Sequence, residues 1–178
     1  VITTYDAPLR ENAGFKVLSG NLFDSALMKT SVISDDFRSR FLSKPGEEGV
    51  FEARAIVFEG PEDYHDRIND PDLAIDDHCI LFIRNVGCVG YPGSAEVVNM
   101  QPPYGLVKAG VNHLPPAGDG RQSGTSDSPS ILNASPASAF GDALAYLQTA
   151  YTVPLDLVSS FLNPLVDAQQ WAAREPRT

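Results

Sequence analysis

The residues that could do chemistry are concentrated in one stretch, 118–130, which reads GDGRQSGTSDSPS. Ser123 and Thr125 are hydroxyl residues two positions apart, and Gly124 between them would let the backbone come close to a ligand. Arg121 offers a planar guanidinium that can bind a carboxylate. A hydroxyl acts as a base or nucleophile only where a metal ion or strong donors activate it, and the stretch contains no His. The pattern is typical of either an active-site loop or a plain turn rich in Ser.

A second glycine-rich stretch, residues 87–93, leads into the acid Glu96 in GYPGSAE. Glu96 has two interpretations: an acid that stabilises the N-terminus of a helix, or a ligand to a metal ion. Neither glycine-rich stretch is a GxGxxG motif or a P-loop with its Lys, so neither predicts a nucleotide site.

The two cysteines, Cys79 and Cys88, have neither CxxC spacing nor a His-rich cluster beside them. Two Cys and three scattered His do not assemble the four ligands of a structural zinc site. Reduced, partly buried thiols of a cytoplasmic protein are the simpler interpretation.

The totals indicate one globular domain, since the 178 residues are 43% hydrophobic and 20% charged. Lys and Arg number 13 and Asp and Glu 23, which gives a formal net charge of −10. This acidity disfavours nucleic acid and anionic membrane surfaces as partners, and no stretch approaches the ~20 apolar residues of a membrane span. We expect a cytoplasmic protein, although a chain that begins with Val rather than Met says little about a leader.

The elements that must position the two loops are many short strands and a few short helices. The helix over PASAFGDALAYLQT is expected to have Ser135 as N-cap and Pro136 as its first residue. Strands are expected in FKVLSGN, SALMKTSVI, VFEARAIVFEG, HCILFIRN, SILNAS, YTVPLDLV and SFLNPLV. Further helices are expected in DDFRSRFLSKPGEEG, PEDYHDRINDPDL, PPYGLVKAGVNHL and DAQQWAAREP.

This pattern predicts a single α/β domain with a β-barrel-like, strongly curved sheet and a few short flanking helices, rather than a doubly wound parallel sheet. Residues 1–19 are interpreted as an extended lead-in, and residues 20–178 as the domain.

Four long motifs resemble the C-terminal domain of the IlvD/Edd dehydratases. In chain order they are GNLFDSALMKTSVIS, FEARAIVFEGPEDYHDRINDP, ILFIRNVGCVGYPGSAEVVNMQPP and GDGRQSGTSDSPSILNASP. The resemblance covers the chain from about Gly20 to its end. GRQSGTS together with GYPGSAEVVNM is more similar to the aldonic-acid, xylonate-type branch than to the branched-chain biosynthetic one.

The resemblance implies a swivelling β-barrel domain that caps a larger α/β domain, with the active site at their junction. In this family an iron–sulfur cluster acts as Lewis acid on the leaving hydroxyl, Mg²⁺ binds the carboxylate end of the substrate, and a serine alkoxide removes the α-proton. Carried over by motif, Ser123 is the expected base, Thr125 its neighbour in the pocket, and Glu96 a ligand of Mg²⁺. Arg121 and Gly124 are expected to bind the substrate. The product is a 2-keto-3-deoxy acid.

The sequence departs from the family pattern in three places. The cluster-binding cysteines belong to the N-terminal domain, and Cys79 and Cys88 do not replace them, so we expect this chain alone to hold no cofactor. Asp127 stands where the pattern has Gly. Residues 150–151 replace a usual Gly-Asp turn, which predicts an altered C-terminal hairpin.

Two functional hypotheses follow from the sequence. In the first, the chain is the C-terminal domain of an aldonic-acid dehydratase, and it is inactive until it is joined to the N-terminal domain. Its partners are then that N-terminal domain and a small sugar acid. In the second, it is an autonomous, non-catalytic binding module derived from that domain. An apolar face that normally meets the N-terminal domain would then favour a homo-oligomer or a new partner.

Overall fold

The structure is a computed structural model that describes residues 2–9, 14–91, 96–97, 100–122 and 127–166. The strands within these ranges are β1 (Phe15–Leu18), β2 (Ser25–Lys29), β3 (Val50–Phe58), β4 (Cys79–Ile83), β5 (Glu96–Val97), β6 (Pro116–Gly118), β7 (Arg121–Gln122), β8 (Ile131–Ser135), β9 (Thr152–Asp156) and β10 (Phe161–Leu162). The α-helices are α1 (Asp35–Phe41), α2 (Pro61–Arg67) and α3 (Tyr104–Lys108). Short 3-10 helices are η1 (Thr30–Val32), η2 (Pro71–Leu73), η3 (Ser138–Phe140) and η4 (Ala143–Tyr146).

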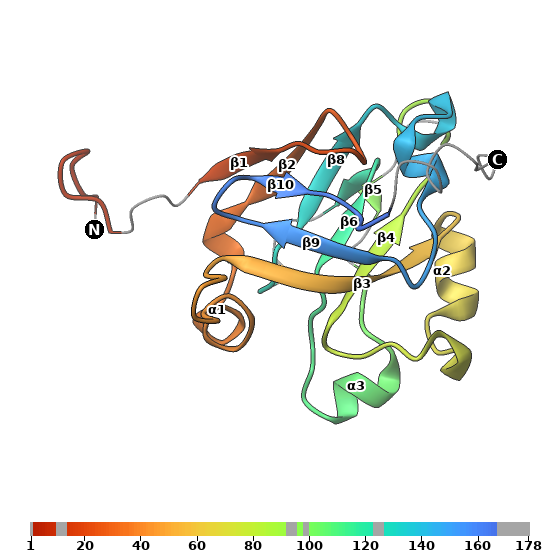
Figure 1. Ribbon diagram of the computed structural model, residues 1–178, viewed down its shortest axis with the longest axis horizontal. Helices are drawn as coiled ribbons and strands as arrows, with labels where there is room; N and C mark the ends of the chain where they lie inside the picture. Colours follow the sequence, from red (N-terminus) through yellow and green to blue (C-terminus); the bar gives the residue numbers. More distant parts are fainter. Residues whose placement is uncertain (1, 10–13, 92–95, 98–99, 123–126, 167–178) are drawn as a thin grey trace.

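Eight of the described strands form one mixed sheet in the order β1-β2-β8-β6-β4-β3-β9-β10. Its central strands β8, β6, β4 and β3 run parallel to one another, and the outer pairs are antiparallel. The last strand returns to the first, because the Ser19 amide donates to the Ser160 carbonyl at 3.1 Å and the Leu162 amide donates to the Ser19 carbonyl at 3.1 Å. The sheet is thereby nearly closed into a barrel (Figure 1), which confirms the predicted fold class.

The central strands are buried on both faces. Ile80 and Phe82 of β4 belong to the cluster that fills the barrel. Leu81 and Ile83 belong to a second cluster, which also includes Tyr64 of α2. A strand covered on both faces reads as a continuous apolar run, as CILFI does.

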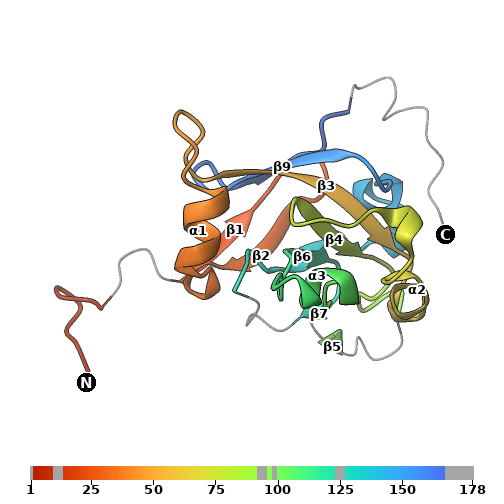
Figure 2. The ribbon, with the colours of Figure 1, turned by 90° about the horizontal axis from the view of Figure 1, so that it is seen from below.

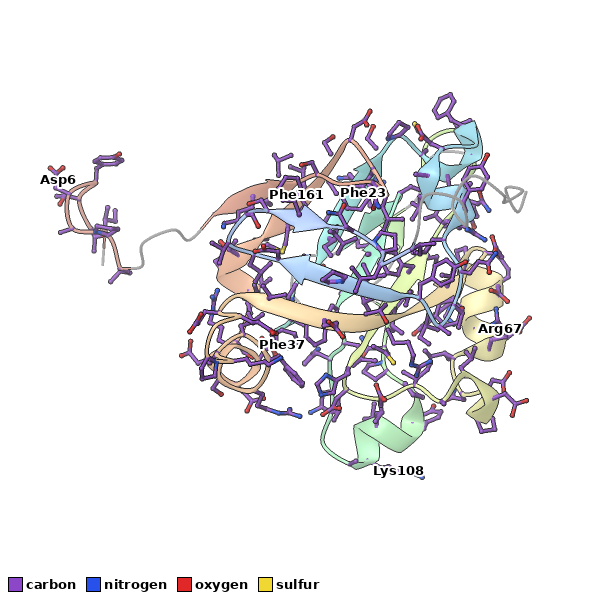
Figure 3. The ribbon with its side chains drawn as sticks, viewed as in Figure 1. Asp6, Phe23, Phe37, Arg67, Lys108 and Phe161 are labelled. Carbon is purple, nitrogen blue, oxygen red and sulfur yellow. The ribbon has the colours of Figure 1, made fainter. Side chains whose placement is uncertain are left out.

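Local sequence signals set the helices. Ser34 is the N-cap of α1, since its hydroxyl accepts from the Phe37 amide at 3.1 Å. The ring of Phe37, which is labelled in Figure 3, then packs on the Phe51 ring of β3 with 5.3 Å between centroids. Pro61 begins α2, where the absent amide proton costs no hydrogen bond. The predicted helices at these two places and after Pro103 are confirmed.

The single helix predicted over 136–149 is wrong. Strand β8 continues through Ser135, and the following residues form the separate turns η3 and η4. Gly141 interrupts them with φ of 77°, and the Asp142 side chain then caps η4 by accepting from the Ala143 amide. The helix predicted over 167–176 lies outside the described residues.

The described part of the predicted lead-in has two forms. Residues 2–9 are exposed and extend away from the barrel, as the position of Asp6 shows (Figures 1 and 3), whereas residues 15–18 form β1 within the sheet. Among the described helices, none is long and apolar enough to span a membrane.

Candidate active site

The carboxyl ends of the parallel strands form the edge at which the candidate site lies. The chain leaves β3 at Glu59, β4 at Arg84 and β6 at Asp119, all on neighbouring strands. Loops at this end of parallel strands commonly carry the functional residues of α/β proteins. Both glycine-rich stretches of the sequence begin here.

The two glycine-rich stretches meet through the short parallel pair of β5 and β7, in which Glu96 lies opposite Arg121 and Val97 opposite Gln122 (Figure 2). This pairing joins segments that the sequence shows only as separate loops. It places the backbone of Glu96 beside the strand that leads directly into Ser123.

Close backbone contact explains two of the glycines. A Cβ on Gly120 would lie 2.5 Å from Cγ2 of Val86, and a Cβ on Gly87 would lie 3.0 Å from Cβ of Ala137. Both are shorter than ordinary contacts, so a side chain at either position would push the loops apart. The stretch after β4 is therefore packed directly on the stretch after β6.

A buried arginine organises one side of this edge. Arg84 is 1% exposed, and its Nε donates to Oε2 of Glu59 at 2.8 Å, while its Nη2 pairs with Oε1 of the same carboxylate. Its Nη1 donates to the carbonyls of Leu144, Ala145 and Leu147 at 2.7–3.0 Å. Arg84 thus ties η4 to the strand edge, and its role is structural. The isolated Arg in the apolar run CILFIRN was the available sequence signal for such a buried, paired charge.

Asp119 organises the other side. It is 6% exposed, and its Oδ2 lies 2.6 Å from the Ser138 hydroxyl and accepts from the Ser138 amide at 2.9 Å and the Asn85 amide at 3.3 Å. Its Oδ1 accepts from the Val86 amide at 3.2 Å. The carboxylate therefore joins the loops that follow β4, β6 and β8. Sequence reasoning missed it, since an Asp between two glycines is typical of an ordinary turn.

Only part of the predicted site falls on described residues. Ser123, Gly124 and Thr125 lie outside them. Arg121 lies in β7 with its side chain exposed. For Glu96 only the main chain is described, in β5; a position at the N-terminus of a helix, one of the two interpretations, is therefore wrong.

Gln122, the residue before Ser123, is 6% exposed. Among the described residues neither its Oε1 nor its Nε2 finds a hydrogen-bond partner. Burying a side-chain amide without a hydrogen-bond partner costs free energy.

The cysteines do not fit an iron–sulfur cluster. Cys79 is buried in β4, where its sulfur lies 3.2 Å from Nη2 of Arg54 and accepts from the Asp76 amide at 3.4 Å. Burial raises the pKa of the Cys79 thiol to about 11. A cluster is held by several Cys, and the chain has two. Cys88 is exposed. Within the described ranges, no three His, Cys, Asp or Glu residues gather as a metal site.

The far end of the 118–130 stretch is anchored beside α1. The Asp127 carbonyl accepts from the Ser34 amide at 3.0 Å, and the Asp127 carboxylate lies 3.2 Å from Nε2 of His113. The φ of Asp127, 52°, is in the left-handed region, which Gly adopts without steric cost. A cleft of about 300 Å³ lies beside this anchor, between α1 and residues 110–113.

The sequence of this chain resembles those of known proteins along its whole length. The whole chain, residues 1–178, matches the family described as dihydroxy-acid/6-phosphogluconate dehydratase C-terminal. It is 62% identical over 98% of its length to D-xylonate dehydratase of Caulobacter vibrioides. Identity is 34% over 98% to L-arabinonate dehydratase of Rhizobium leguminosarum bv. trifolii, and 32% over 99% to phosphogluconate dehydratase of Escherichia coli. The chain spans only 27–29% of the length of these three relatives.

Proposed function

Because the chain belongs to the dihydroxy-acid/6-phosphogluconate dehydratase family as its C-terminal domain, we propose that it supplies one half of the active site of an aldonate dehydratase. The proposed reaction removes water from a 2,3-dihydroxy sugar acid, D-xylonate in the first instance, and yields a 2-keto-3-deoxy acid. The name and identity of the relative from Caulobacter vibrioides support this substrate. The observation that carries the proposal is the pairing of β5 with β7, which brings the two glycine-rich stretches together.

The residues of this chain have separate proposed roles. Ser123 is the base that takes the proton from C2, while the C3–O bond breaks with its electrons going to the oxygen. The leaving hydroxide takes up one proton and departs as water, and Ser123 gives up the proton it took, so that overall one water is removed. The resulting enol tautomerises to the keto acid. Arg121, whose side chain is exposed, and the backbone at Gly124 bind the substrate carboxylate, and Thr125 lines the same pocket.

The metal groups of the family fit this chain only in part. Glu96 would give one carboxylate to Mg²⁺, but a Mg²⁺ site needs further oxygen ligands. An iron–sulfur cluster does not fit, because such clusters are held by several Cys and this chain has two, of which Cys79 is buried in β4 and Cys88 is exposed. We propose that residues of an N-terminal domain complete both groups, and that the 178-residue chain is inactive alone.

The test compares this chain with the full-length enzyme that contains it, by measuring release of 2-keto acid from D-xylonate. We expect turnover by the full-length enzyme only. In that enzyme Ser123→Ala should lower kcat by about 10² to 10⁴, the contribution of a positioned base. Ser39→Ala, on the exposed side of α1, is the matched control and should leave kcat unchanged.

Two results would contradict the proposal. Turnover by the isolated chain would show that the site is complete without a second domain. A folded full-length protein that is inactive on D-xylonate and related sugar acids would favour the other hypothesis, an autonomous binding module.

A further inference from the structure

The carboxylate of Asp119 connects the three loops that follow β4, β6 and β8. Its partners are backbone amides of Asn85 and Val86, directly after β4, and the amide and hydroxyl of Ser138, in η3 after β8. The Ser138 hydroxyl also accepts from the Asn85 amide at 2.8 Å. The three loops therefore share one buried polar centre.

The geometry calls for a carboxylate rather than another acceptor. Both oxygens face donors, three on Oδ2 and one on Oδ1. An amide in its place would turn an NH₂ group toward at least one backbone N–H. A hydrogen bond to a charged acceptor is also stronger than a neutral one, and a buried centre of this kind is rigid.

The position of this centre relates it to the candidate site. Asp119 is two residues before Arg121, and Val86 begins the stretch that ends in Glu96. A Cβ on Gly87 would lie 3.2 Å from the Asp119 carbonyl oxygen, so the backbones of these two residues are already in contact. Asp119 thus fixes the distance between the strand ends from which β5 and β7 follow.

We propose that Asp119 is a positioning residue for the reaction: it does not touch the substrate, but it sets the relative placement of the two stretches that carry Glu96, Arg121 and Ser123. This inference rests on the proposed function. It predicts that loss of the carboxylate affects the rate of the chemical step more than it affects substrate binding or global stability.

The test uses Asp119→Asn in the full-length enzyme, with Thr149→Val as matched control. The Thr149 hydroxyl makes a comparable side-chain bond, because it accepts from the amide of Val57 in β3 at 3.0 Å. This bond is made to a strand of the sheet rather than to the loops at its edge. We expect Asp119→Asn to lower kcat about 10- to 100-fold, as loss of an outer-shell partner does, with KM for D-xylonate changed less than about threefold. Thr149→Val should lower the melting temperature with kcat unchanged.

Hydrogen exchange gives a second readout that needs no turnover. The amides of Asn85, Val86 and Ser138 should exchange faster in Asp119→Asn and stay protected in Thr149→Val. If Asp119→Asn fails to fold, Ser138→Ala removes only the hydroxyl and should give the same changes in weaker form.

The outcomes separate the inference from the function on which it rests. If Ser123→Ala inactivates the enzyme but folded Asp119→Asn keeps its kcat within twofold, Asp119 is structural only and the inference is wrong. If Ser123→Ala is fully active, the proposed site itself is wrong.

Discussion

Glu96 and Arg121 lie opposite each other in the parallel pair of β5 and β7. One is an acidic and the other a basic residue, and they belong to two stretches that follow the neighbouring strands β4 and β6. This relationship makes the carboxyl edge of the barrel a single surface rather than two unrelated loops.

The first prediction concerns Arg121. In the full-length enzyme Arg121→Lys should raise KM for D-xylonate about tenfold, equal to about 1.4 kcal/mol, because an ammonium cannot make the bidentate contact of a guanidinium. Steady-state kinetics measure it. Arg67→Lys, which alters a half-buried pair with Asp63 on α2, away from the candidate site, is the control and should leave KM unchanged. A fall in kcat at constant KM would instead assign Arg121 a role confined to the transition state.

The second prediction concerns loop packing. Gly120→Ala should lower the free energy of unfolding by about 1–3 kcal/mol, since the new methyl group would meet the Val86 side chain. Gly105→Ala is the control, because nothing lies within 4 Å of a Cβ there and Ala favours the helix α3. Urea unfolding of both variants measures the difference. Equal stability of the two would mean that the loops are not in the contact described.

The third prediction concerns the backbone at Asp127. Asp127→Gly and Asp127→Ala both remove the side-chain contact with His113, but only Ala retains the penalty of a left-handed φ. The Gly variant should therefore be more stable than the Ala variant by about 1 kcal/mol. Thermal unfolding of the two proteins in parallel measures this difference. A more stable Ala variant would argue against the left-handed conformation.

The fourth prediction concerns pH. The pKa of the Cys79 thiol is raised from 9.0 to about 11 by burial. Above pH 9 the unfolded chain loses this proton while the folded chain keeps it, so stability should fall as the pH rises from 9 toward 11. Melting temperatures measured across this range should decline less steeply in Cys79→Ala than in Cys88→Ala, which keeps the buried thiol. Parallel declines in the two variants would assign the loss of stability to other groups.

The sequence correctly predicted those elements that depend on residues close to one another in the chain. The cap at Ser34 and Pro at position 61 mark the starts of α1 and α2, and the apolar run of β4 marks a buried strand. The predicted helix over 136–149 was wrong because contacts with distant segments decide the structure at both Ser135 and Ser138. β8 pairs with β2 up to Ser135, and Ser138 is held by Asp119.

The site was predictable only in its residue types. Glu96 was open to interpretation as an acid at a helix start, whereas its place in β5 depends on pairing with Arg121, 25 positions later in the chain. Asp119 and Arg84 carry no periodic signal, since their importance comes from amides and carbonyls contributed by distant segments. Ser123, Gly124 and Thr125 remain predictions.

The closure of the barrel also has a consequence for how the domain is made. The Asn21 amide donates to Oδ1 of Asn163 at 2.8 Å across a separation of 142 residues, beside the seam between β1 and β10. On the ribosome, β1 emerges early but has no second neighbour until almost the whole domain has been synthesised. Until then its outer edge presents unpaired backbone groups, the template for pairing with other chains. The nascent polypeptide is therefore most exposed to aggregation just before translation reaches β10, when seven of the eight described strands of the sheet exist without the last one.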